Sequence, residues 1–464
     1  MGLFVREKSF YKTFFTLTII IGLQNIITFG VNLSDNLLVG GYSESALSGV
    51  ALGNQIQFVL QMLVMGVGEG LVILASRYWG AKDIDSIKRI ASIGMRLSIF
   101  VGILAWAVVF FFPQGIMSLF TNDEQVIFEG ANYVQIVCFS YISFSITATL
   151  LATLRSVETV KVGFILASST LVINVVLNYL LIYGNFGFPR LGVEGAAIAT
   201  LAARVIELLI ICIYIKRYDR KIYLKLRDFF QFEMALFKHY INIGSPIVMS
   251  NFIWGVAMAM QTAILGHMGA EAIAANSIAT TIFQIVSVVV FASASATTVI
   301  IGKTIGEGRV DKIISYAKTL QMLYLVIGVC TGIMLFITKD HVLDFYSISQ
   351  EARVLALQFM TVLSVTVCGT AYQMPCLTGI VRSGGDTRFV LYNDTIFMWL
   401  IVLPGSALCA FVFDLSPLLV FICLKSDQIL KCFVAIVKVN RFRWIQTFDS
   451  YSTTESKEKA VSVN

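Results

Sequence analysis

Residues 14–38 read FFTLTIIIGLQNIITFGVNLSDNLL, a long apolar run that carries a single charged side chain, Asp35, near its end. A run of this length is long enough to cross the hydrocarbon core of a bilayer as a helix. An Asp at the centre of a membrane helix costs about 2.5 to 3.5 kcal/mol, so it usually faces a protein interior or a wet cavity. Asp35 is therefore a candidate functional residue. The alternative is an Asp at a helix end that reaches headgroups and water.

The composition of the chain indicates that the membrane is its solvent. Of the 464 residues, 57% are hydrophobic and only 13% are charged, and the mean hydropathy is +0.81. Repeated apolar runs in such a chain predict membrane helices rather than one soluble core. The first run is not a cleavable signal, because it has no small-residue cleavage site and similar runs follow it. We expect an integral multi-pass protein of the cytoplasmic (inner) membrane.

The apolar runs predict an all-α fold of twelve transmembrane helices. Their expected ranges are 11–41, 46–77, 86–112, 124–155, 161–184, 192–215, 241–266, 271–302, 313–337, 351–383, 386–411 and 414–437. Lys and Arg gather before the first helix and after every second one, while the loops at 42–45 and 113–123 carry none. By the positive-inside rule both termini are predicted to be cytoplasmic.

The charges and the reactive side chains exclude several classes of function. The net charge of +6 is spread over the predicted cytoplasmic loops and not gathered on one surface, which argues against a nucleic-acid partner. No CxxC pair is present, and His239, His267 and His341 are isolated, so we expect neither a metal centre nor a cofactor. The absence of HExxH and GxSxG motifs disfavours an enzyme. An ion channel is disfavoured because no filter-like segment interrupts the helices.

The sequence repeats itself once. Residues 38–41 and 44–47 resemble 264–267 and 270–273, at an offset of 266 − 40 = 226, and residues 80–85 resemble 306–311 at the same offset. Each copy holds six predicted helices, so the copies should enter the membrane in the same direction and be related by a pseudo-twofold axis along its normal. We expect an N-terminal lobe (1–215), a cytoplasmic linker (216–240), a C-terminal lobe (241–437) and a cytoplasmic tail (438–464).

The linker mixes basic and aromatic residues. Six of the residues in 216–227 are Lys or Arg, and Phe229, Phe230, Phe232 and Phe237 follow them. This composition suits a segment that lies on the anionic inner leaflet, so membrane lipids are expected partners. A solvated linker anchored by a few aromatic side chains is the alternative.

Several motifs, in this order, resemble those of the multidrug and toxic compound extrusion (MATE) family, of the prokaryotic kind. They are Asn32-Leu33-Ser34-Asp35, Arg77-Tyr78-Trp79-Gly80-Ala81-Lys82-Asp83, Asn174 with Asn178, Gly192-Val193-Glu194-Gly195-Ala196-Ala197-Ile198-Ala199-Thr200, and Arg382-Ser383-Gly384-Gly385-Asp386-Thr387. Each motif is weak alone, but together they span nearly the whole chain. The resemblance implies a MATE-like pair of six-helix lobes that exports bulky, lipophilic, often cationic compounds against inward sodium ions or protons.

The resemblance also implies an ion-coupling site in the first lobe, formed by Asp35, Asn174, Asn178 and Thr200. Carboxylate, amide and hydroxyl oxygens suit a sodium ion, and a partly desolvated carboxyl suits a proton. Many relatives carry an Asp at the position of Asn178, so this chain has one negative charge where they have two, which leaves the coupling ion open. The alternative role for the two Asn side chains is hydrogen bonding between helices, which contributes about 0.6 kcal/mol within membranes.

The second lobe lacks this set of side chains. Gln261 stands at the repeat position of Asp35, since 261 − 35 = 226. The second lobe instead carries Asp394, and Lys425, Asp427 and Lys431 interrupt its last predicted helix. Asp427 and Lys431 are four residues apart and can pair on one helix face. A structural ion pair and a role in transport both stay open for these charges, because charges inside membranes are paired in either case.

Polar, aromatic and soft side chains on the predicted helices are candidates for a drug-binding cavity. They are Gln55, Gln57, Gln61, Met65, Tyr141, Met249, Trp254, Met258, Gln261, Gln284 and Tyr372. Such side chains repack around varied ligands, and ring faces attract organic cations. Taken singly, each is more often a core or lipid-facing residue.

The function we expect is therefore secondary active multidrug efflux, in which organic cations or lipophilic drugs leave the cell in exchange for sodium ions or protons. We expect the chain to work as a monomer. The alternative is a flippase or exporter of a lipid-linked or amphiphilic metabolite. A strongly cationic cavity would favour that alternative, whereas the candidate lining is nearly neutral.

Overall fold

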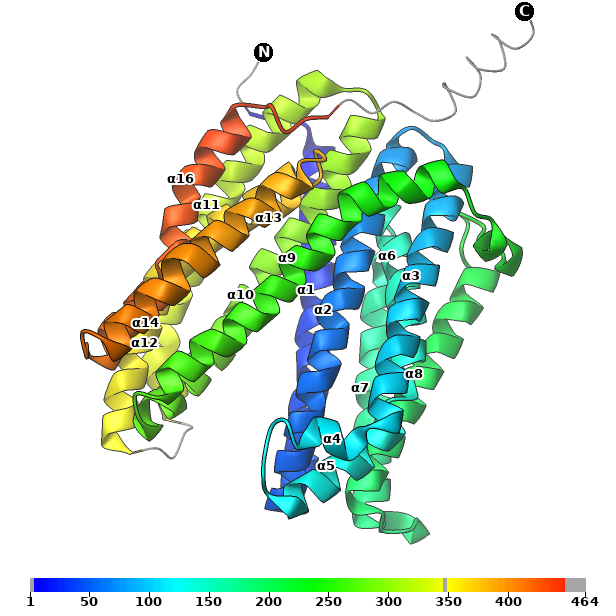
Figure 1. Cartoon of the computed structure of the whole chain (residues 1–464). Coiled ribbons are helices and arrows are strands. Elements are labelled where there is room, and N and C mark those ends of the chain that lie inside the picture. The colour runs from blue at the N-terminus through cyan, green and yellow to red at the C-terminus, as the bar shows by residue number, and fades with distance from the viewer. Residues whose placement is uncertain (1–3, 345–348, 447–464) are drawn as a thin grey trace, which may run out of the picture. The chain divides into compact units, whose positions relative to one another are not determined.

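The computed structural model describes residues 4–344 and 349–446, and this part of the chain is built of helices joined by short loops, without a β-strand (Figure 1). The helices form two compact units. The amino-terminal unit comprises Leu23–Ala75 and Ile84–Asn251. The carboxy-terminal unit comprises Met1–Gly22, Ser76–Asp83 and Phe252–Asn464.

The first half of the chain forms eight α-helices. They are α1 (Lys8–Gly40), α2 (Glu44–Gly80), α3 (Ile84–Phe111), α4 (Pro113–Met117), α5 (Glu124–Val137), α6 (Ser140–Ser156), α7 (Lys161–Tyr183) and α8 (Gly192–Arg217), with a short 3₁₀ turn, η1 (Asn185–Gly187), before α8. Helices α5 and α6 are bent by 52° relative to each other, and together they are long and apolar enough for one membrane span. Local sequence explains two boundaries. Asp123 caps α5 by accepting hydrogen bonds from the backbone N–H groups of Gln125 and Val126, and Gly184 ends α7 in a left-handed conformation.

The second half repeats this pattern with more interruptions. After η2 (Leu226–Phe230) come α9 (Met234–Gly266), α10 (Ala270–Gly306), α11 (Val310–Leu343), α12 (Gln350–Met374), η3 (Pro375–Val381), α13 (Thr387–Thr395), η4 (Ile396–Val402), α14 (Leu403–Phe411), α15 (Pro417–Lys425) and α16 (Asp427–Asn440). Segments η3 and η4 are π-helical and continue α12 and α13. Such wide turns occur where a helix accommodates strain, and Pro375, which has no backbone N–H, stands at the first of them.

The predicted all-α polytopic fold is confirmed. Among the described residues, ten helices are long and apolar enough to cross a membrane, and the bent α5–α6 pair makes eleven. The twelfth predicted helix, 414–437, is present as two shorter helices, α15 and α16, separated at Ser426. The charges of Lys425, Asp427 and Lys431 lower its hydropathy, and the break falls between the first two of them.

Three helices take part in both units. The first part of α1, up to Gly22, packs in the carboxy-terminal unit and the rest in the amino-terminal unit. Helix α2 changes unit after Ala75, and α9 changes unit after Asn251, close to Pro246 in its interior. The predicted lobes, 1–215 and 241–437, describe the repeat in the sequence, whereas these units describe packing. The lobe boundaries stay a prediction.

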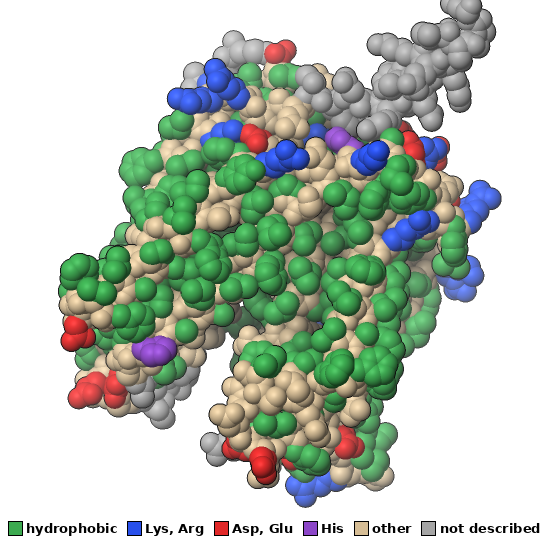
Figure 2. Space-filling model, viewed as in Figure 1, with side chains coloured by type: hydrophobic (Ala, Val, Ile, Leu, Met, Phe, Trp, Pro, Cys, Tyr) green, Lys and Arg blue, Asp and Glu red, His purple; other side chains and the backbone are tan. Residues whose placement is uncertain are grey.

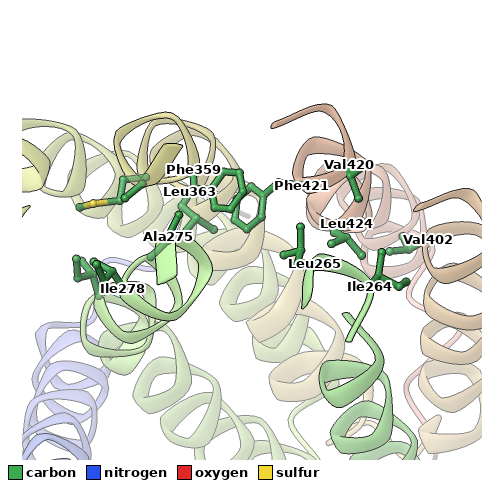
Figure 3. Packing of buried hydrophobic residues seen from close by; sticks show 14 of the residues in the cluster. Ile264, Leu265, Ala275, Ile278, Phe359, Leu363, Val402, Val420, Phe421 and Leu424 are labelled. Atoms are coloured by element: carbon green, nitrogen blue, oxygen red, sulfur yellow. The ribbon is translucent and has the colours of Figure 1, made fainter. Parts of the chain in front are cut away.

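Hydrophobic side chains cover the sides of the helices, as expected of a protein surrounded by lipid (Figure 2). Each unit also has a buried apolar cluster. In the carboxy-terminal unit this cluster joins α9, α10, α11, α12, η4, α14 and α15. At its centre the rings of Phe359 and Phe421 stack with their centroids 4.0 Å apart (Figure 3). Phe421 lies one helical turn before Lys425, so this apolar core leads directly to a buried charge.

Candidate functional site

Three of the predicted site residues form one hydrogen-bonded chain inside the amino-terminal unit. Asp35 lies in the last turns of α1, and its Oδ1 accepts a hydrogen bond from Asn178 Nδ2 at 2.5 Å. The same Nδ2 donates to Asn174 Oδ1 at 3.1 Å. Because residues four apart share a face of a helix, α7 presents both amides toward α1. Asn174 and Asn178 are almost completely buried, and Asp35 is partly exposed.

The chain of contacts leaves one amide oxygen without a donor. Asn178 Oδ1 is buried and has no hydrogen-bond partner. Leaving a buried acceptor unsatisfied costs about 1 to 3 kcal/mol. Carboxylate and amide oxygens are ligands that hard cations prefer, and a proton on Asp35 would add a donor. The cluster is therefore chemically suited to accept a small cation or a proton.

Thr200, the fourth predicted site residue, lies on α8, which packs against α5. Tyr133 on α5, which the sequence analysis did not single out, is buried and lies near Thr200. The Tyr133 hydroxyl donates to Asn54 Oδ1 on α2 at 3.4 Å. Tyr133 also interacts electrostatically with Asp35. An isolated Tyr and an isolated Asn carry no motif, so only the packing of α2 and α5 reveals them.

Helix α8 contributes a second pair of charges near Asp35. Arg204 lies 2.8 Å from Glu207 and over the ring of Phe144, at 5.3 Å from its centroid. The charge of Arg204 also acts on Asp35. The three charged side chains of this cluster sum to −2 + 1 = −1. Among these three side chains, one negative charge is therefore not balanced by a cation.

The carboxy-terminal unit holds a different set of charges, which includes three of the four that the sequence analysis named. Lys431 lies 3.1 Å from Asp394 and 3.3 Å from Asp427, and Arg382 lies 3.8 Å from Asp394. These contacts join α16, α13 and the end of η3. Each carboxylate has a cation beside it, as structural ion pairs within membranes require.

The drug-cavity candidates fall into three groups by exposure. Tyr141 and Gln261 are buried inside their units, and Tyr372 is half-buried and donates to Gln321 Oε1 at 2.8 Å. Gln57 and Met258 are partly exposed. The exposed candidates are Gln55, Gln61, Met65, Met249, Trp254 and Gln284. Some of these residues belong to one unit and some to the other. That they line a single drug-binding cavity stays a prediction.

These features define a class: an integral membrane protein of two helical units, one of which contains a cluster of one acid and two amides. The sequence profile of the MatE family matches residues 21–180 and 246–408, which is most of the chain and covers both copies of the repeat. The chain therefore belongs to the MATE family of transporters.

Curated relatives and solved structures agree with this assignment. The chain is 24% identical to "Probable multidrug resistance protein NorM" of Thermotoga maritima, over 91% of this chain and 90% of that protein. It is 23% identical to "Multidrug resistance protein MdtK" of Pectobacterium atrosepticum, over 82% of this chain and 84% of the relative. A crystal structure of a MATE protein in complex with MaL6 superposes with a TM-score of 0.84 at 19% identity, covering 93% of this chain and 96% of the other. At that identity the likeness establishes a shared fold.

Proposed function

We propose that the protein is a secondary active multidrug efflux transporter, which exports lipophilic or cationic organic compounds in exchange for inward sodium ions or protons. Family membership and the names of the relatives support multidrug efflux. The observation that carries the exchange is the Asp35–Asn178–Asn174 cluster, a partly exposed carboxylate beside two buried amides, one of which has an oxygen without a donor. In such a site a cation binds most strongly when it is least shielded by water.

The cluster can transmit ion binding because α1 takes part in both units. Neutralising Asp35 changes its contacts with α7, and the segment of α1 before Leu23 packs in the other unit. Repacking of α1 at Asp35 therefore acts on both units through one continuous helix. Ion and drug are coupled if they bind the same conformations with different affinities. We propose that an ion arriving from outside favours release of the drug, and that release of the ion inside resets the cycle.

The choice between sodium and proton rests on the single negative charge. One carboxylate can carry one proton or one sodium ion. With the amide oxygens of Asn174 and Asn178 and the hydroxyl of Thr200, the proposed site would offer hard ligands only, which slightly favours sodium. All of these residues belong to one chain, so we propose that a single protomer carries out transport.

We propose that both termini and the linker face the cytoplasm and that the linker lies on anionic lipids. Asp219 accepts hydrogen bonds from the backbone of Lys221 and Tyr223, and Lys88 lies 3.7 Å from Asp228, so the linker acids are engaged by the protein itself. The neighbouring Lys and Arg side chains are exposed. Leu226 and Phe230 are 84% and 82% exposed beside them. This pairing of exposed apolar and basic side chains fits the surface of an inner leaflet.

The test is accumulation of ethidium in inverted membrane vesicles under an imposed sodium gradient or an imposed pH gradient. We expect one of the two gradients to drive accumulation in the wild type, and Asp35→Asn to abolish it at equal protein level in the membrane. Asp394→Asn is the matched control, because it removes a carboxylate from the other unit. Wild-type accumulation in Asp35→Asn would refute the assignment. Absence of accumulation under both gradients in the wild type would contradict drug antiport and favour a lipid or metabolite substrate.

A further inference from the structure

The repeat position of Asp35 in the carboxy-terminal unit is occupied by Gln261, and this amide binds a buried lysine. Lys425 Nζ donates to Gln261 Oε1 at 3.0 Å, across the space between α9 and α15. Gln261 Nε2 donates in turn to the sulfur of Met398 at 3.2 Å. Gln261 and Lys425 are 5% and 8% exposed. In the amino-terminal unit this position carries the acid Asp35, which accepts a hydrogen bond from an amide. In the carboxy-terminal unit it carries the neutral Gln261, whose oxygen accepts from the ammonium of Lys425.

The surroundings of Lys425 resemble the ligand set of a cation site. Its ammonium lies 5.5 Å from the centroid of the Phe421 ring, which stacks on Phe359 (Figure 3). Among the described residues, no carboxylate oxygen lies within 4.0 Å of Lys425 Nζ, and Asp427 acts on it from farther away. Amide oxygens and aromatic faces both attract cations. Buried ammonium groups usually pair with a carboxylate, so this environment is unusual for a structural lysine.

The charged cluster around Asp35 and the charged cluster around Lys425 and Lys431 differ in the sign of their summed charge. In the amino-terminal unit Asp35, Glu207 and Arg204 sum to −2 + 1 = −1. In the carboxy-terminal unit the acids Asp394 and Asp427 face three cations, Arg382, Lys425 and Lys431, and the sum is −2 + 3 = +1. An added monovalent cation would neutralise the first set and increase the excess charge of the second. The electrostatics thus favour an exchangeable cation in the amino-terminal unit and oppose one in the carboxy-terminal unit.

We propose that Lys425 is a tethered cation, which permanently fills in the carboxy-terminal unit the place that a transported ion takes beside Asp35. The proposal rests on the proposed role of the Asp35 cluster and deepens it by fixing the stoichiometry. One monovalent ion is coupled to each transport cycle, and Lys425 is the residue that determines this number. The repeat would otherwise offer two equivalent positions for the ion.

Thermal unfolding of the purified full-length protein tests this in a series of variants. A cation that binds only the folded state raises the melting temperature. The probes are NaCl, with choline chloride at equal ionic strength as the control, and a pH series. We expect the wild type to respond to sodium or to pH, and Asp35→Asn to lose that response. In the Asp35→Asn background, Gln261→Asp combined with Lys425→Met should restore a response, because the new carboxylate is no longer paired with the ammonium.

The matched control is Gln261→Asp in the same background with Lys425 retained. It should remain unresponsive, since the ammonium already neutralises the new carboxylate. Equal responses with and without Lys425, or no response in either, would overturn the tethered-cation proposal. A response of the wild type that persists in Asp35→Asn would instead overturn the proposed function.

A second measurement needs no variant of the carboxy-terminal unit and applies even if the combined variant fails to fold. In proteoliposomes, opposing gradients of ethidium and of the coupling ion are adjusted until net flux stops. The balance point gives the number of ions exchanged per drug, corrected for the membrane potential. We expect one ion per ethidium. A value of two would overturn the proposal.

Discussion

At the same position of the repeat, one unit carries an acid, Asp35, and the other carries a neutral amide, Gln261, that binds a lysine. Asp35 is surrounded by amides, and one amide oxygen beside it, Asn178 Oδ1, has no donor. At the equivalent position Gln261 already holds the ammonium of Lys425, and the neighbouring Lys431 contacts two carboxylates. An incompletely satisfied cluster can exchange an ion, whereas a satisfied one stabilises packing. The comparison therefore supports the proposal that transport chemistry belongs to the amino-terminal unit, and that the charges of the carboxy-terminal unit are structural.

The largest expected effect is the loss of transport in Asp35→Asn, compared with Gln261→Asn at the repeat position. The first change removes the negative charge of its cluster, and the second only shortens an amide side chain. We expect no measurable ion-driven ethidium uptake for Asp35→Asn, and at least half of the wild-type rate for Gln261→Asn. Equal loss in both variants, at equal amounts in the membrane, would break the comparison.

A large effect on stability, without a specific effect on transport, is expected for Lys431→Met. This change leaves the buried Asp427 without its close cation, and breaking a buried ion pair in this way costs about 3 to 5 kcal/mol. The melting temperature of the purified protein measures it, with Lys431→Arg as the charge-retaining control. Uptake per folded molecule should stay near the wild-type value. A changed ion dependence of uptake would show that these charges take part in coupling.

Asn178→Leu should weaken ion binding while leaving the protein folded. It removes both the hydrogen bond to Asp35 and the acceptor oxygen that lacks a donor. Removing a group that orients or completes an ion site typically lowers affinity about 10- to 100-fold. The ion concentration for half-maximal uptake should rise by that factor. An unchanged ion dependence would indicate that the two Asn side chains only join helices.

Much of the fold could be predicted from the sequence, because each span across a bilayer requires its own long apolar run. The break between α15 and α16 and the π-helical segments were not predicted, since hydropathy averages over such local features. The exchange of helix segments between units depends on packing between distant parts of the chain.

The candidate site could be predicted in part. The charge of Asp35 in an apolar run and the four-residue spacing of Asn174 and Asn178 can be read directly from the sequence. Tyr133 and the contact of Lys425 with Gln261 are not, because they join helices that are far apart in the sequence.

The smallest expected effect is that of Tyr133→Phe. The change removes the hydroxyl that donates to Asn54, and a single hydrogen bond contributes about 0.5 to 1.5 kcal/mol. We expect a shift of a few-fold in the ion concentration for half-maximal uptake, with an unchanged maximal rate. Tyr372→Phe, which loses a hydroxyl in the carboxy-terminal unit, is the matched control and should show no shift.

The most direct measurement of the central claim counts the exchangeable cations on the purified protein. Binding of radioactive sodium at fixed pH, and proton uptake after a pH step, are measured for the wild type, Asp35→Asn and Lys425→Met. The wild type should hold one sodium ion, or exchange one proton, at a site that Asp35→Asn eliminates and Lys425→Met leaves intact. The same cation count in Asp35→Asn as in the wild type would contradict the account.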